Sequence, residues 1–101
     1  MTIKLFSPHF QSGQTLTAGA TAASADITAK DENVRIVNKN TTTGFYVRTY
    51  PSTDTVAATA ADLYIAPNDV CIIRKDESHD KISYFGPDGN CIFNLITGVG
   101  L

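Results

Sequence analysis

The chain has 101 residues and a formal net charge of −2, and 18% of its residues are charged. The chain therefore has no excess of basic side chains for binding nucleic-acid phosphates. No apolar run approaches the roughly 18 residues of a membrane span, which argues against a transmembrane protein. Apolar residues make up 43% of the chain. That share is too high for a chain that is disordered throughout, so we expect one β-rich domain over residues 1–101.

The first 13 residues are predicted to form an extended N-terminal arm. Thr2–Phe6 alternates between polar and apolar residues until Pro8 interrupts it. The apolar residues around this proline are Leu5, Phe6 and Phe10. Apolar extended arms commonly pair with the sheet edge of another chain. A first strand folded back on the chain's own core is the alternative. The apolar stretch is too short for a signal peptide, so we expect synthesis in a cytosol.

Short β segments separated by turn residues dominate the rest of the chain. Besides the arm, the sequence predicts strands at Gln14–Ala18, 25–28, Asn33–Asn38, Phe45–Tyr50, Leu63–Ile65, Val70–Lys75, Lys81–Phe85 and Cys91–Thr97. This pattern is typical of sandwiches, jelly rolls and small barrels. The predicted fold class is therefore all-β: an antiparallel β-sandwich or jelly-roll-like domain with about eight short strands and little or no helix.

Three further expectations concern how the strands are arranged. A polar turn joins Asn33–Asn38 to Phe45–Tyr50, which indicates a hairpin. Val70–Lys75 is apolar on both faces until its end, which indicates a central strand with both faces partly covered. The core is expected to lie between residues 34 and 96, with little contribution from the first thirty residues beyond the arm.

Few side chains are placed for catalysis. His9 and His79 lie far apart in the chain. The stretch Asp76–Asp80 lacks the regular ligand spacing of oxygen-rich ion sites, so we expect a solvated hairpin loop there. Asp31 and Glu32 are neighbours and would face opposite sides of a strand. We therefore expect no enzyme activity, no metal and no cofactor.

The two cysteines each lie in an apolar stretch. Cys71 and Cys91 have no histidine nearby in the chain, so they do not form a zinc site. We expect two buried, inert thiols, because a free cysteine behaves as a small apolar residue. A disulfide between neighbouring strands is the alternative, which a reducing cytosol disfavours.

One strand has a face suited to binding. Tyr46, Arg48 and Tyr50 alternate along Phe45–Tyr50 and share one face. Tyrosine and arginine are enriched in interface hot spots, so these residues, with Leu5, Phe6 and Phe10 of the arm, are the predicted partner interface. Two alternatives stay open: an aromatic row that stacks on sugars, and the ordinary half-buried face of a sandwich strand.

From about residue 25 to the C-terminus, short segments follow a recognisable order. The segments are Val34–Asn38, Phe45–Arg48, Ala57–Asp62, Ile65–Pro67, Val70–Ile73 and Thr97–Leu101. In this order the chain resembles small virion proteins of tailed bacteriophages, of the decoration (cement) type. The charged stretch at 76–80, the two cysteines and the longer N-terminal lead depart from that group and leave the location in the virion open.

The resemblance implies a structural role. Decoration proteins sit on the capsid surface and clamp neighbouring subunits of the major capsid protein, which would be the partner here. It also implies manufacture in the host cytoplasm and a homo-oligomer, such as a trimer at local three-fold positions. The alternatives are a head fibre base, a neck or tail adaptor, or a carbohydrate-binding β-sandwich module.

Overall fold

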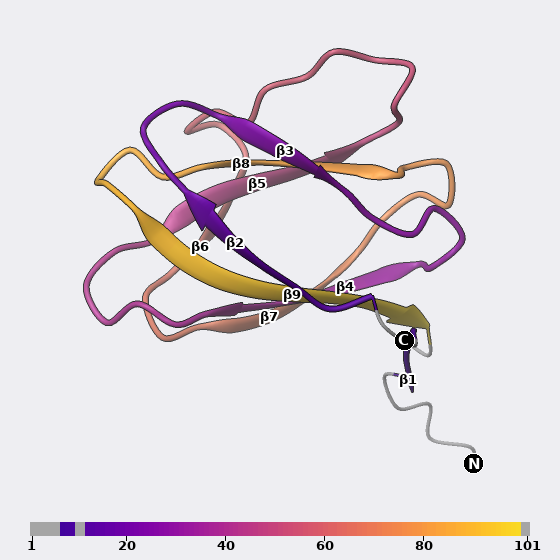
Figure 1. Ribbon diagram of the computed structural model, residues 1–101, viewed down its shortest axis with the longest axis horizontal. Coiled ribbons are helices and arrows are strands. Elements are labelled where there is room, and N and C mark those ends of the chain that lie inside the picture. Colours follow the sequence, from indigo (N-terminus) through magenta and orange to yellow (C-terminus); the bar gives the residue numbers. More distant parts are fainter. Residues whose placement is uncertain (1–6, 10–11, 100–101) are drawn as a thin grey trace.

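The computed structural model of the protein describes residues 7–9 and 12–99. The predictions for Leu5, Phe6 and Phe10 therefore lie outside the described residues. The described residues form nine β-strands and no helix (Figure 1). Within these ranges, no helix is long and apolar enough to cross a membrane. The predicted all-β class is confirmed.

The strands form two antiparallel sheets that face each other (Figure 1). Sheet A has the order β1-β9-β4-β7, with β2 also paired to β9; its strands are β1 (Ser7–Pro8), β2 (Gln14–Ala18), β4 (Asn33–Asn38), β7 (Val70–Arg74) and β9 (Cys91–Val99). Sheet B has the order β3-β8-β5-β6; its strands are β3 (Ala23–Asp26), β5 (Phe45–Tyr50), β6 (Leu63–Ile65) and β8 (Lys81–Phe85).

The strand pairs are nested along the chain. β2 pairs with β9, β3 with β8, β4 with β7 and β5 with β6. The chain from β2 to β9 is thus one long antiparallel ribbon that turns back between β5 and β6. Folding this ribbon over itself adds the pairs of β4 with β9 and of β5 with β8. This is the strand order of a jelly roll, which confirms the fold class and selects one of its two forms.

The predicted hairpin between β4 and β5 is wrong, because the two strands lie in different sheets. Each strand points apolar side chains toward the core. The buried side chains concerned are Val34 and Ile36 on β4 and Phe45 and Val47 on β5. In a hairpin these four would line one face of one sheet. The polar segment 39–44 instead crosses between the sheets, so that the two sets face each other.

β7 is an edge strand rather than the predicted central strand. Cys71 and Ile73 point inward and pack against the core. Val70 and Ile72 alternate with them and are exposed. The apolar pattern on both faces of β7 therefore reflects an uncovered outer face and not a second covering layer.

The core lies between the sheets and is centred on aromatic rings. Phe45 of sheet B stacks on Phe93 of sheet A with 4.2 Å between ring centroids, and Tyr84 meets Phe93 edge-on at 5.2 Å. The other buried members of this core cluster are Ala18, Ile27, Val34, Ile36, Val47, Ile65, Ile82, Cys91 and Leu95. The expectation of little core contribution from the first thirty residues is wrong, because β2 supplies Ala18 and the segment after β3 supplies Ile27, while Leu16 of β2 and Ala25 of β3 pack against this core.

The two cysteines are free. Cys91 is buried as predicted, and its Sγ lies 3.4 Å from the Asn38 Oδ1. Cys71 is only half-buried, because none of the described strands lies on the outer side of β7. Burial raises the pKa of the Cys71 thiol, and the negative charge of Asp69 raises it further.

Candidate binding surfaces

An aromatic row crosses the outer face of sheet B. The aromatic row consists of Tyr64 on β6, Tyr46 on β5 and Phe85 on β8. The three side chains lie side by side, because the strand register pairs Tyr46 with both of the others. The ring centroid of Tyr46 lies 5.1 Å from that of Tyr64 and 6.3 Å from that of Phe85. Tyr64 is 46% exposed. Gly44 makes room for it, since a Cβ at that position would collide with the Tyr64 ring.

Tyr46 and Arg48 of the predicted interface share the face of this aromatic row. Tyr46 is half-buried beneath its neighbours, while Arg48 is exposed and lies 3.8 Å from the Asp62 carboxylate. The interface role of Tyr46 and Arg48 stays a prediction, because their surface position does not identify a partner.

Tyr50 is on the same strand face but is only 7% exposed. The loop 51–62 folds onto this part of sheet B, where the Ala58 N–H donates to the Ser83 Oγ at 2.9 Å. Ala58 and Ser83 are both buried there. Tyr50 lies where this loop begins, so its side chain is largely withdrawn from any partner.

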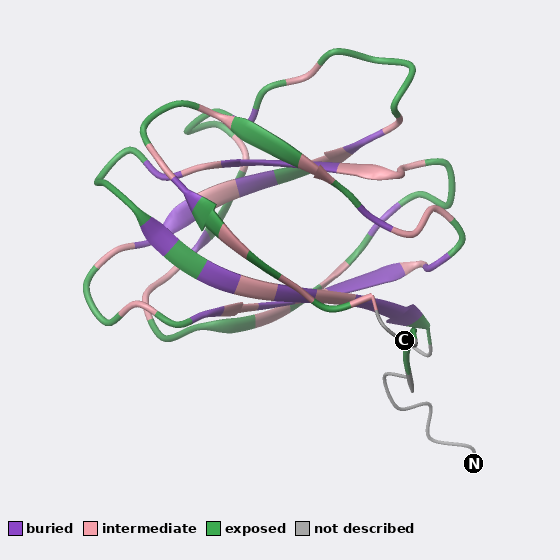
Figure 2. Ribbon diagram, in the orientation of Figure 1, coloured by how far each residue is buried: buried purple, intermediate pink, exposed green. Residues whose placement is uncertain are grey.

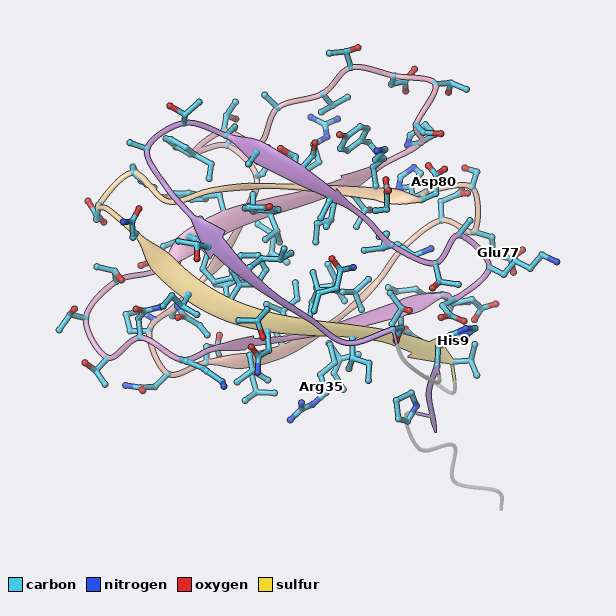
Figure 3. The ribbon with its side chains drawn as sticks, in the orientation of Figure 1. His9, Arg35, Glu77 and Asp80 are labelled. Carbon is cyan, nitrogen blue, oxygen red and sulfur yellow. The ribbon has the colours of Figure 1, made fainter. Side chains whose placement is uncertain are left out.

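A second surface lies on the outer face of sheet A. It carries five large aliphatic side chains that we call the aliphatic face: Val37, Val70, Ile72, Ile92 and Ile96. Arg35 stands beside Ile72 on one side and Ile96 on the other. Figure 3 shows the Arg35 side chain pointing away from the sandwich. Along β9, Figure 2 shows buried residues that alternate with exposed or partly buried ones, so sheet A has one face in the core and one toward solvent.

His9 is held against a buried carboxylate at one end of sheet A. The His9 Nδ1 lies 3.3 Å from the Asp31 Oδ2, and the Thr97 hydroxyl donates to the same oxygen at 2.7 Å. The Ser12 hydroxyl donates to the backbone oxygens of His9 and Thr97. Ser12 is therefore not placed as a nucleophile that His9 activates. The cluster anchors the leading strand β1 to β9.

The acidic stretch Asp76–Asp80 connects β7 in sheet A with β8 in sheet B, so the predicted hairpin loop is wrong. The Ser78 backbone N–H and hydroxyl donate to the Asp76 carboxylate, and these bonds lower the pKa of Asp76. The His79 Nδ1 lies 2.9 Å from the Thr49 hydroxyl. Among the described residues, no group of three or more His, Cys, Asp or Glu could hold a metal ion.

Asp80 ties this stretch to the loop after β5. Its Oδ1 accepts the Ser52 N–H at 2.7 Å, and hydrogen bonding from the Ser52 side chain and backbone lowers the pKa of Asp80 from its ordinary value of 3.8. Such a carboxylate stabilises the fold above its unfolded-state pKa, and this contribution is lost as the pH falls through the folded-state pKa. We predict that Asp80→Asn makes the acid-induced fall of the thermal midpoint shallower, between about pH 5 and about pH 2.

The control for this prediction is Asp88→Asn, in the exposed turn after β8. Its thermal midpoint should follow pH as in the wild type. Equal slopes for the wild type and Asp80→Asn would contradict the stabilising role of the Ser52–Asp80 hydrogen bond.

Two shallow depressions lie near the start of β2, with volumes of about 330 and about 400 Å³. They are lined by Gly13–Thr15 with Asn94–Ile96, and by Ser12 and Gln14 with Asp26–Thr28. Asp26 is the one ionisable side chain in these linings, and it pairs with the Lys81 Nζ at 2.5 Å. The depressions therefore gather no set of convergent chemical groups, and the two outer sheet faces are the stronger candidates for binding.

No family model and no curated protein matches the sequence. Among solved structures, a protein of the Bacillus endospore appendages, which form disulfide-linked pili, is similar at a TM-score of 0.53 and 17% identity, over 96% of this chain and 89% of that chain. A cupin superfamily protein of Desulfitobacterium hafniense is similar at 0.49 and 12% identity, over 94% and 76% of the two chains. The Drosophila melanogaster CENP-C cupin domain is similar at a TM-score of 0.48 and 11% identity, over 87% of this chain and 59% of that chain. At these identities the likeness concerns the fold alone.

Proposed function

We propose that this protein is a structural component of a tailed-bacteriophage virion: a decoration (cement) protein that binds the major capsid protein and stabilises its shell. The observation that carries the proposal is the aliphatic face of sheet A. Val70 is 51% exposed, Ile92 48% and Ile72 39%. Large apolar side chains gathered on one face of a small protein are typical of a docking site for another protein.

The chemistry of the aliphatic face suits a protein partner. Arg35 lies among the aliphatic side chains, and a guanidinium surrounded by apolar groups can donate several hydrogen bonds to a partner's carbonyl or carboxylate oxygens. The side chains stand on three hydrogen-bonded strands, β9, β4 and β7. Because the backbone is already ordered in a sheet, docking costs little further conformational entropy.

Two further observations support the proposal that the protein binds to a particle built of many identical subunits. The endospore-appendage protein, which shares the fold, forms pili, so a jelly roll of this size is compatible with assembly into a large structure. The resemblance of residues 25–101 to decoration proteins favours a capsid. On a symmetric shell, multivalent engagement by linked copies strengthens individually modest contacts.

The proposal is tested by co-sedimentation with phage particles purified from a strain that lacks this protein. We expect the wild type to bind and Ile92→Glu, which places a charge in the aliphatic face, to bind at least about tenfold more weakly. Leu63→Glu is the matched control, since Leu63 is 45% exposed and belongs to sheet B. Absence of wild-type binding, or equal binding by Ile92→Glu and the wild type, would overturn the proposal.

Carbohydrate binding is the second candidate, and the aromatic row is the observation that favours it. Tyr46, Tyr64 and Phe85 form a continuous aromatic strip on an outer sheet face, and exposed rings can stack on the apolar faces of sugars. A glycan array tests this candidate: Tyr64→Ala should abolish binding to any glycan that the wild type retains. If the wild type retains none, the candidate fails.

A further inference from the structure

The outer edge of β7 has no strand beside it among the described residues. At the two ends of the β4·β7 pair, the Asn38 N–H donates to the Asp69 oxygen at 2.9 Å and the Lys75 N–H donates to the Glu32 oxygen at 2.8 Å. Hydrogen-bonded positions alternate along antiparallel strands. The backbone N–H and C=O groups that point away from β4, toward the free edge, therefore belong to Val70, Ile72 and Arg74.

The other sheet edges are less suited to pairing. β6 has three residues and is soon followed by Pro67, and β3 ends in the charged Asp26. β2 contains one large apolar residue, Leu16. β7 has five residues, and only the last of them, Arg74, is charged. Proteins normally protect sheet edges with short strands, charges or proline, and β7 has little of this protection.

The side chains of β7 are incompletely covered on both faces of the sheet. Cys71 and Ile73 pack against the core but stay half-exposed, and Val70 and Ile72 are exposed on the opposite face. One more strand along this edge would cover apolar surface on both faces and satisfy the free backbone groups. The edge of β7 thus has the properties of an acceptor for an added strand.

We propose that residues 2–6 of a second copy of the chain add to sheet A along the free edge of β7. Thr2–Phe6 has five residues, as β7 has. In a strand, Ile3 and Leu5 would share one face and cover Cys71 and Ile73 on the core side. The length and the alternation of the segment therefore match the edge that it would complete.

Charge does not oppose this pairing. Lys4 is the one charged side chain in residues 2–6. Asp69 lies before β7, and at the other end Arg74 and Lys75 are followed by Asp76 and Glu77, so these five side chains leave a net negative charge around the strand. The net charge of the edge therefore does not repel a cationic segment.

The chain's own residues 2–6 cannot reach this position and pair there. β1 lies on the far side of β9 and β4 from β7 (Figure 1). At about 4.8 Å per strand, the place beyond β7 is about 19 Å from β1. Five fully extended residues span at most about 18 Å. All of residues 2–6 would be needed to cross the sheet, and none would remain to pair along β7. The β7 edge that these residues pair with therefore belongs to another copy.

The proposed contact joins two different surfaces, an arm at one end of sheet A and an edge on its opposite side. Each copy can donate one arm and accept one. Such a head-to-tail contact builds a closed ring if the rotation between copies closes, and an open filament if it does not. It does not depend on which shell, if any, the protein decorates.

Sedimentation of the full chain and three variants tests the proposal. We expect the full chain to form oligomers and the deletion of residues 2–6 to give monomers. Arg74→Pro removes an N–H at the free edge, so it should also abolish assembly, whereas Arg74→Ala keeps the N–H and should assemble as the wild type does. Circular dichroism identifies any unfolded variant, and Val70→Lys then replaces Arg74→Pro as the edge variant.

Mixing two monomeric variants distinguishes this contact from any other. The deletion variant keeps its edge and the edge variant keeps its arm, so together they should form a one-to-one complex and nothing larger. A monomeric full chain, assembly by the deletion variant as by the wild type, or no complex in the mixture would each overturn the proposal. None of these results bears on capsid binding, which the Ile92→Glu experiment tests separately.

Discussion

Phe93→Ala is expected to destabilise the fold by about 3–5 kcal/mol. Phe93 is fully buried and lies between two other rings, stacked on Phe45 at 4.2 Å and edge-on to Tyr84 at 5.2 Å. It therefore joins sheet A to sheet B at the centre of the only core that the described residues form. Truncation removes these contacts and leaves a cavity that two facing sheets cannot readily close.

Urea denaturation measures the free energy of unfolding, and the thermal midpoint should fall by at least about 12 °C, at about 4 °C per kcal/mol. Ile92→Ala is the matched control on the neighbouring residue. Ile92 points to the opposite, solvent face of β9 and is 48% exposed, so its truncation should cost less than about 1 kcal/mol. Similar losses for the two variants would contradict the assignment of the core face of β9.

Asn38→Ala is expected to cost about 2–3 kcal/mol. Asn38 is 2% exposed, and its Nδ2 donates to the backbone oxygens of Thr43 at 3.0 Å, Ile65 at 3.3 Å and Ala66 at 3.0 Å. Its Oδ1 accepts the Asn40 N–H at 3.0 Å. One side chain thus fixes two of the crossings between the sheets, the one from β4 to β5 and the one from β6 to β7. Alanine would leave these buried groups without partners.

Two further variants sharpen the prediction for Asn38. Asn38→Asp keeps the shape but brings a carboxylate against three carbonyl oxygens. Its pKa should rise in the folded state, so this variant should be least stable near neutral pH and recover relative to the wild type as the pH falls. Asn90→Ala, in an exposed turn, is the control and should change stability by less than about 0.5 kcal/mol. If Asn38→Ala leaves the free energy of unfolding unchanged, the crossings are held by other contacts.

The bounds of several strands could be predicted from the sequence because the side-chain alternation is strong. β2, β4, β5, β6 and β8 begin and end at the predicted residues. In β4 and β5, apolar residues two apart define the inward face. Alternation does not say in which sheet a strand lies, however. The pairing of β4 with β9 joins residues about 60 apart, and no local pattern in either strand reports that contact.

β7 shows how one pattern can have two physical origins. Val70–Arg74 is apolar on both faces, which occurs in strands covered by two layers and also in strands with an exposed apolar surface. The sequence alone could not distinguish them, because the second layer would come from elsewhere in the chain. Only the structure distinguishes them: Val70 is 51% exposed and Ile72 39%, so no described segment covers the outer face of β7.

The candidate site was only partly predictable. Tyr46 and Arg48 could be placed on one outer face from alternation, but their partners Tyr64 and Phe85 become visible only through the register of β6 and β8. The burial of Tyr50 depends on the loop 51–62, whose small and polar residues give no sign that it folds onto sheet B. The aliphatic face was missed for a related reason, because its members come from three strands distant in the chain.

The most direct test of the proposed function is the number of copies of this chain in purified phage particles, measured against the major capsid protein by a quantified gel. A decoration protein occupies sites repeated over the whole shell. We predict a copy number comparable to that of the major capsid protein. A handful of copies per particle would place the protein at a neck, a fibre base or a tail instead, and its absence from particles would contradict a virion role altogether.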